Sequence, residues 1–135
     1  DNQLLLKLLD EWCIYKDCEE SVELQSEKKA LVRGLENWEE YELQGIIVEG
    51  ESDVFAFSIY EKLNDNTILV HFEKAKPFIK GAFQLINQLT AQKVYLEGYK
   101  FINRECDHGL PGLRQAKQSY HPVYMEKCFT LEQLH

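Results

Sequence analysis

The sequence has no long hydrophobic run and no recognisable targeting segment. Its apolar stretches are only a few residues long, whereas a helix that spans a membrane needs about 20 consecutive, mostly apolar residues. No basic segment is followed by an apolar stretch of the kind that forms a secretory signal peptide. We therefore expect a protein without a transmembrane segment.

Cysteine and histidine are few, and their spacing is not that of metal ligands. Cys13 and Cys18 form a C-x4-C pair, and the chain has neither a zinc-binding pattern nor a redox C-x-x-C motif. The four histidines form no H-x3-H or H-E-x-x-H pattern. We expect reduced thiols, a cytoplasmic location and no metal site.

Glycine and proline are also scarce, with 7 and 3 residues in a chain of 135. Because no linker, internal repeat or low-complexity segment divides the chain, residues 1–135 are predicted to form a single domain. The first residue is Asp1 rather than Met, so we expect either a trimmed chain or a piece of a longer protein.

Basic residues are outnumbered, but they are not evenly spread. The formal net charge is −8, which excludes a surface that coats nucleic acid non-specifically. Residues 1–70 carry 6 basic and 17 acidic side chains, whereas residues 71–117 carry 8 basic and 4 acidic ones. The basic segment could face a phosphate-bearing ligand, or it could reflect chance in where surface lysines fall.

The spacing of the apolar residues changes several times along the chain, and each change predicts a new element. Helices are predicted over 3–16 and over 26–38, strands over 45–49, 54–60 and 67–72, a helix over 78–90, a strand over 99–102, a helix that begins at Pro111 and ends before Pro122, and a strand over 123–130. The order α-α-β-β-β-α-β-α-β predicts an α/β fold with a mixed sheet and helices on both of its faces.

The densest polar stretch, residues 103–120, runs from the end of a predicted strand through a loop into a helix. Ligands collect at such places in open α/β sheets, and a helix N-terminus favours an anion. Gly109 and Gly112 would let the backbone approach a ligand, while Arg114 and Lys117 share a helix face. Alternatively, this is an ion-paired loop and Tyr120 belongs to the core.

Residues 101–122 resemble the hallmark of a bacterial family of uncharacterised proteins that is related to the C-terminal domain of phosphatidylglycerol lysyltransferase. The matching positions are Phe101, Ile102, Asn103, Arg104, Glu105, Asp107, Gly109, Gly112, Leu113, Arg114, Ala116, Lys117, Ser119, Tyr120 and Pro122. Residues 33–37, 55–57, 71–75 and 80–87 support the resemblance, which extends over about 24–127. The sequence departs from the family pattern at Cys106, His108 and Gln118.

This resemblance implies a GNAT-like acyltransferase fold, with the chain as the second of two tandem repeats and a preceding repeat in the same polypeptide. The central strand, 67–72, would splay from the strand 99–102 and lead into a donor-binding loop. The corresponding segment, 73–82, has one glycine and three lysines instead of the two-glycine cradle of acyl-CoA enzymes. Aminoacyl-tRNA is therefore favoured over acyl-CoA as the co-substrate, and the lysines would meet phosphate as point charges.

The resemblance also suggests roles for individual residues. Glu73 and Asp107 are the candidate general bases, Asn103 would hydrogen-bond the donor or the acceptor, and Tyr120 would be a general acid. The candidate anion-binding residues are Lys80, Gly81, Arg104, Gly109, Gly112, Arg114 and Lys117. The alternative is a repeat without catalytic activity that binds a ligand or completes the fold.

Overall fold

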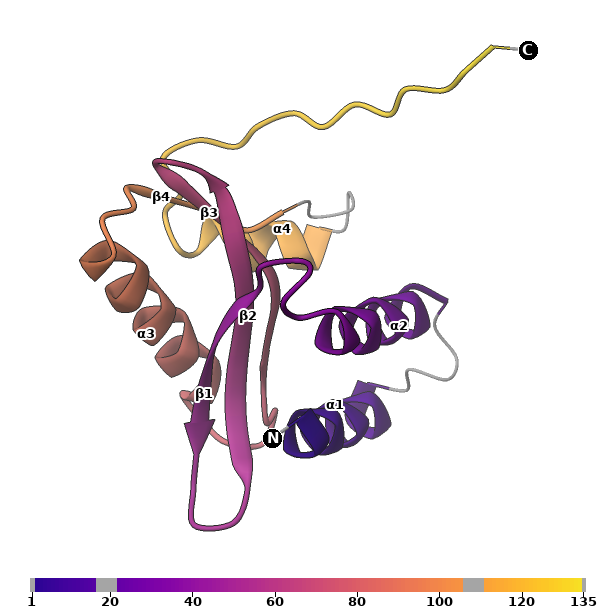
Figure 1. Ribbon diagram of the computed structural model, residues 1–135, viewed down its shortest axis with the longest axis vertical. Coiled ribbons are helices and arrows are strands. Elements are labelled where there is room, and N and C mark those ends of the chain that lie inside the picture. The colour runs from indigo at the N-terminus through magenta and orange to yellow at the C-terminus, as the bar shows by residue number, and fades with distance from the viewer. Residues whose placement is uncertain (1, 17–21, 106–110, 135) are drawn as a thin grey trace. The chain divides into compact units, whose positions relative to one another are not determined.

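Figure 1 shows the computed structural model of the chain, which describes residues 2–16, 22–105 and 111–134. The chain divides into two compact units, Asp1–Asn103 and Arg104–His135, which are described separately below as the first and the second unit. The first unit contains α1 (Asn2–Lys16), α2 (Val22–Glu36), β1 (Gln44–Glu49), β2 (Val54–Asn64), β3 (Thr67–Ala75), α3 (Ala82–Leu96) and β4 (Phe101–Asn103). The second unit contains α4 (Pro111–Gln118).

The sheet of the first unit is mixed, as the sequence predicts. Its strand order is β1-β2-β3-β4. The pairs β1–β2 and β2–β3 are antiparallel, whereas β3–β4 is parallel and joins Thr67, Ile68 and Leu69 to the three residues of β4. A parallel pair needs a crossover connection, and α3 provides it.

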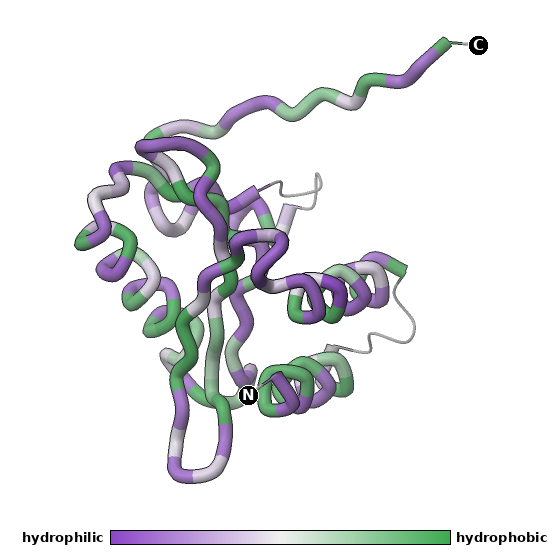
Figure 2. Tube along the Cα trace, in the orientation of Figure 1, coloured by the Kyte–Doolittle hydropathy of each residue, from purple (hydrophilic) through white to green (hydrophobic). Residues whose placement is uncertain are grey.

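Helices cover both faces of the sheet, which confirms the second part of the prediction (Figure 1). On one face, Leu8 of α1 and Leu31 of α2 pack with Phe57 and Ile59 of β2. On the other face, the core is formed by Tyr60 and by small and branched side chains of α3, β2 and β3. Its buried members are Ala56, Ala75, Ala82, Ile86, Tyr60, Ile68, Val70 and Val94. In Figure 2 hydrophobic residues dominate α1 and recur along the central strands.

Two irregularities in the strand register decide which side chains face α3. Val48 pairs with Ala56 while Glu49 pairs with Val54, so Phe55 is an extra residue in β2. Ile59 pairs with Phe72 while Tyr60 pairs with Val70, so His71 is an extra residue in β3. An extra residue shifts all later side chains to the opposite face.

The ends of α3 differ from the prediction of 78–90. The helix begins after Gly81, whose φ of 83° is left-handed, and continues to Leu96. At its end the Tyr99 amide donates to the Val94 carbonyl and the Gly98 amide to the Tyr95 carbonyl. This is the Schellman arrangement, in which the residue at the position of Gly98 adopts a left-handed φ, here 96°.

The other predicted elements of the first unit exist, with different ends. The helix α2 begins at Val22, four residues before the predicted start at residue 26. The strand β2 continues to Asn64, and β3 continues to Ala75 because it stays paired with β2 beyond Phe72. Glu73 therefore lies within a strand and not in a loop after it.

The second unit differs more from the prediction. The helix α4 begins at Pro111, as predicted, and ends at Gln118. The predicted strand 123–130 is wrong, because these residues are irregular and exposed, and the described residues of their unit include no strand with which they could pair. Val123, Phe129 and Leu131 are among its exposed hydrophobic side chains.

Two expectations concern the chain as a whole. Cys13 is disulfide-bonded, which corrects the expectation of reduced thiols for this residue. Within the described part of the chain, no helix is both long enough and apolar enough to cross a membrane.

Candidate functional site

The two parallel strands of the first unit, β3 and β4, end at different places. In β4 the last residue, Asn103, pairs with Leu69, whereas β3 continues to Ala75. Within the described residues of this unit, the later part of β3 is therefore paired with β2 alone. At a rise of about 3.3 Å per residue, Glu73 lies about 13 Å beyond Leu69 along the strand. The two predicted residues Glu73 and Asn103 thus lie on neighbouring strands but far apart along the sheet.

Glu73 faces α3 because of the extra residue at His71. It stands opposite Ser58 in the ladder, and its Oε1 accepts a hydrogen bond from Nδ2 of Asn87 at 3.3 Å. Ser58 is fully buried, and its hydroxyl has no hydrogen-bond partner within the described part of the chain. Sequence reasoning did not single out Ser58, and it noted Asn87 only within the family resemblance. In the sequence, the feature that could have indicated Asn87 as a site residue is its position next to Ile86, on the apolar face of the predicted helix.

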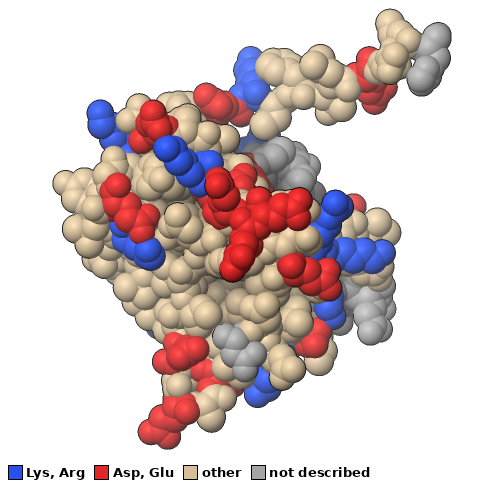
Figure 3. Space-filling view, viewed as in Figure 1, with Lys and Arg blue, Asp and Glu red and all other residues tan. Residues whose placement is uncertain are grey.

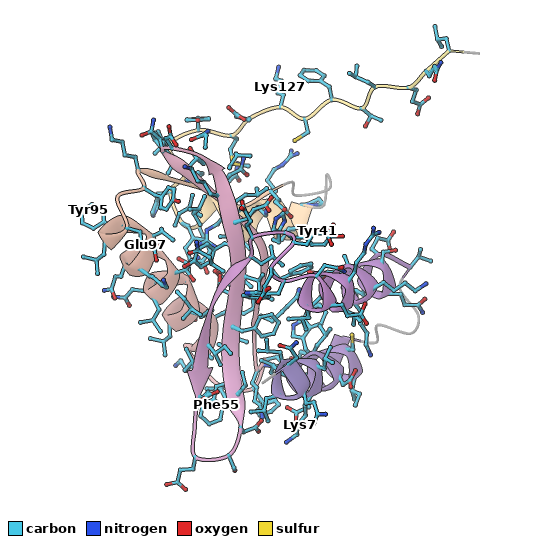
Figure 4. All side chains as sticks on the ribbon, in the orientation of Figure 1. Lys7, Tyr41, Phe55, Tyr95, Glu97 and Lys127 are labelled. Carbon is cyan, nitrogen blue, oxygen red and sulfur yellow. The ribbon has the colours of Figure 1, made fainter. Side chains whose placement is uncertain are left out.

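A second feature of the first unit is a pocket of about 180 Å³ at the N-terminus of α3. Lys80 and Gly81, both predicted to bind an anion, line it beside Phe55 and Leu85. No atom lies within 4 Å of the place where a Cβ at Gly81 would stand, so the backbone there is open to a ligand. A helix N-terminus of this kind favours a negative group. Figure 4 labels Phe55 on β2.

The other two lysines of the segment 73–82 are engaged elsewhere. Lys74 is buried, forms an ion pair with Glu27 of α2 at 2.8 Å, and lies 4.0 Å from the ring centroid of Trp12. Its side chain leaves the α3 face because it stands opposite Phe57. The expectation that Lys74 meets phosphate is therefore corrected.

Lys76 is buried in the same way, and its ammonium contacts two carboxylates. It hydrogen-bonds Asp53 and lies 3.1 Å from Oε2 of Glu11 in α1. The hydrogen bond with Asp53 raises the pKa of Lys76 and lowers the pKa of Asp53. Lys76 thus joins α1 to the sheet, and Lys80 is the lysine of this segment that remains at the pocket.

In the second unit, α4 gathers several of the predicted residues. The Lys117 ammonium donates to the carbonyl oxygens of Arg104 and Glu105, the second at 3.0 Å. The Arg104 guanidinium lies 5.8 Å from the centroid of the Tyr120 ring. Lys117 therefore ties the backbone of Arg104 and Glu105 to α4, and the side chains of Arg104 and Tyr120 lie near each other.

The remaining predicted residues are Gly112 and Arg114, which lie on the exposed helix α4, and Asp107 and Gly109, which fall outside the described residues. Apart from its chain neighbours and the backbone of its own helix, no described atom lies within 4 Å of a Cβ built at Gly112. Among the described residues, no three His, Cys, Asp or Glu side chains form a group that could hold a metal ion.

Comparison with known proteins identifies relatives over nearly the whole chain. Residues 2–132 match the family described as phosphatidylglycerol lysyltransferase, C-terminal. A conserved protein of unknown function from Bacteroides thetaiotaomicron is 39% identical, with a TM-score of 0.84 over 91% of this chain. The chain spans only 41% of that relative's length. The search of curated proteins gave no match.

The fold has a second solved neighbour. A ribosomal-protein-alanine N-acetyltransferase from Brucella melitensis biovar Abortus superposes with a TM-score of 0.58 over 95% of both chains. Its sequence identity of 9% supports a common fold alone. The chain belongs to the family of the phosphatidylglycerol lysyltransferase C-terminal domain and has the fold of a GNAT acetyltransferase.

Proposed function

We propose that this chain is a transferase domain that moves an acyl or aminoacyl group from a phosphate-bearing donor to an amine or hydroxyl, with aminoacyl-tRNA favoured over acyl-CoA. The observation that carries the proposal is the different length of two neighbouring strands: β4 ends at Asn103, opposite Leu69, whereas β3 continues to Ala75 and includes Glu73. An extended acyl group would lie along the part of β3 that continues beyond β4, in the way that extended ligands add to a sheet.

The proposed transfer proceeds in the following steps. The acceptor nitrogen or oxygen attacks the carbonyl carbon of the acyl group, and the Glu73 carboxylate takes the proton that the acceptor loses. The oxyanion of the tetrahedral intermediate needs hydrogen-bond donors beside Glu73. Asn103, about 13 Å away along the sheet, would instead hydrogen-bond a more distant part of the donor or the acceptor. When the intermediate collapses, the bond to the donor oxygen breaks, and that oxygen takes up the proton that Glu73 received.

The choice of donor rests on the segment 73–82, which includes the end of β3. It has a single glycine, Gly81, and only Lys80 of its three lysines lies at the pocket. A pyrophosphate that is held mainly by backbone amides must lie close to the backbone at several positions, and a single glycine allows this at one position only. The family description, which names a lysyltransferase, also favours an aminoacyl donor.

The test is ligand binding followed by activity. At a concentration 100 times its dissociation constant, a ligand that binds only the folded state stabilises it by about 2.7 kcal/mol, which a thermal melt detects. We expect aminoacyl-tRNA to raise the melting temperature more than acyl-CoA does. If neither donor changes it, the transferase proposal fails for this chain.

A matched pair of variants separates catalysis from binding. Glu73→Gln keeps the size and the bond from Asn87 but removes the base, so we expect donor binding to persist while transfer falls about 100-fold or more. Lys80→Met, at the pocket, should weaken donor binding instead. If Glu73→Gln transfers as fast as the parent chain, Glu73 is not the base.

A repeat without catalytic activity is the second candidate, and one observation favours it. Lys74 and Lys76 are held in ion pairs with carboxylates of α1, α2 and the turn before β2, so they support the fold of the first unit. On this alternative the chain binds a donor, or completes a larger protein, and Glu73→Gln changes no measured rate.

A further inference from the structure

The strand β1 is an edge strand that lacks the usual protection. It stands first in the sheet order, so in the described part of the first unit only β2 pairs with it. Its sequence, QGIIVE, has no lysine or proline, and the extra residue of this hairpin belongs to β2. Natural edge strands are normally protected by such residues, by bulges or by being short. The opposite edge, β4, is protected by its length of three residues.

An apolar groove runs beside this edge on the α3 face. It has a volume of about 570 Å³ and lies between β1 and the second half of α3, with Ile46, Leu89 and Leu96 in its lining. Leu96 is 83% exposed. The pocket at the start of α3 is lined by Val48 of β1 and Leu85 of α3, so apolar residues follow β1 along most of its length. Glu97 also lines this groove and is labelled at the end of α3 in Figure 4.

The other face of β1 is partly open as well. Ile47 stands opposite Phe57 on the α1 and α2 side and is 38% exposed. A strand added outside β1 would therefore contact apolar side chains on both faces, at alternate positions. Its backbone would pair with the unpaired amides and carbonyls of β1.

We infer that β1 and the adjoining α3 groove receive a β-strand from another part of a longer polypeptide that contains this chain. The relative from Bacteroides thetaiotaomicron supports this occupant, because the match covers 41% of its length and leaves more than half outside. A strand on the same polypeptide has a high effective concentration, so a six-residue edge suffices to hold it.

A second copy of the chain fits the edge less well. Each copy has a net charge of −8. Glu39, Glu40 and Glu42 are exposed in the loop that leads into β1, and Figure 3 shows acidic side chains gathered over this region. Antiparallel pairing of two β1 strands would bring this acidic loop of each copy near the exposed Glu49 and Glu51 of the other copy, which like-charge repulsion opposes.

Hydrogen exchange tests the inference on unmodified chains. The backbone amides of residues 44–49 are compared between the 135-residue chain and the longer polypeptide that its gene encodes, with the β2–β3 hairpin as the internal reference. We expect the outward amides of β1 to exchange at least tenfold more slowly in the longer polypeptide, independently of concentration. Equal exchange in both, or a gene that encodes nothing more, overturns the inference. So does slowing in the 135-residue chain that increases with concentration, since it identifies a second copy.

A pair of variants gives a second readout. Ile47→Lys places a charge in the added interface and should return β1 exchange in the longer polypeptide to the rate of the 135-residue chain. Leu63→Lys is the control, because Leu63 is 50% exposed near the end of β2 and lies outside the groove. Equal effects of the two variants contradict the inference.

Discussion

Lys76 shows how a lysine of the segment after β3 becomes part of the core. Its side chain is nearly buried between Asp53 and Glu11, and Oε2 of Glu11 is itself buried, with the ion pair to Lys76 but no aligned hydrogen bond. A buried charge is costly without its partner. Removing the lysine takes the ion pair from the buried Glu11 oxygen and leaves Asp53 with Lys7, whose ammonium lies 3.8 Å away. The sequence does not reveal this, since Glu11 and Asp53 lie far from Lys76 along the chain.

We expect Lys76→Met to lower the free energy of unfolding by about 2 kcal/mol, the range for a hydrogen-bonded charged group. Urea denaturation of the parent and variant chains measures the difference. Lys62→Met is the matched control, because the pair of Lys62 with Asp65 is exposed and should contribute little. Equal losses in the two variants would mean that burial of Lys76 is unimportant.

Asp53 predicts a pH dependence. The hydrogen bond with Lys76 lowers the pKa of Asp53 below its ordinary value of 3.8. A carboxylate whose pKa is depressed in the folded state adds stability above its unfolded pKa, and this stability is lost as the pH falls through the folded pKa. We therefore expect stability to decrease below about pH 4. In urea titrations, the free energy of unfolding of Asp53→Asn should decrease less between pH 5 and pH 3 than that of the parent chain. An equal decrease in both chains would contradict this role of Asp53.

At the scale of elements, the sequence predicts which segments are helices and strands better than where they end. The apolar spacing identifies every element of the first unit. It misses the extension of β3 to Ala75, because Glu73 and Lys74 are charged and are kept in the strand by pairing with β2. It also misses the end of α3, although Gly98 is a recognisable stop signal.

The Schellman end of α3 gives a prediction of its own. Gly98 has a φ of 96°, and no atom lies within 4 Å of a Cβ built there, so the cost of a side chain is conformational alone. We expect Gly98→Ala to destabilise the first unit by about 1 kcal/mol in urea denaturation. Gly112→Ala is the control, since Gly112 lies within α4 without a left-handed φ, and alanine favours a helix there. A neutral Gly98→Ala would contradict the described end of the helix.

At the scale of the whole molecule, composition and element order lead to the correct fold class, and the polar stretch 103–120 leads to the correct family. The surroundings of the candidate site are harder to predict. Ser58 faces Glu73 only because His71 is an extra residue in β3, and Lys74 leaves the site for the same reason. Bulges depend on the pairing of two strands, and a single sequence carries no direct signal of them. The roles proposed for Asn103, Tyr120, Arg114 and the other site residues stay predictions.

The most direct test of the proposed site is an NMR titration of the ¹⁵N-labelled chain with acyl-CoA and with an aminoacyl ester of adenosine, which represents the 3′ end of aminoacyl-tRNA. If a donor lies along β3 and reaches the start of α3, the amides of Glu73, Lys80, Gly81 and Asn103 should shift together, with one common dissociation constant and larger shifts for the aminoacyl ester. Binding of either ligand that leaves these four amides unchanged would contradict the site, and so would the absence of any shift at millimolar ligand.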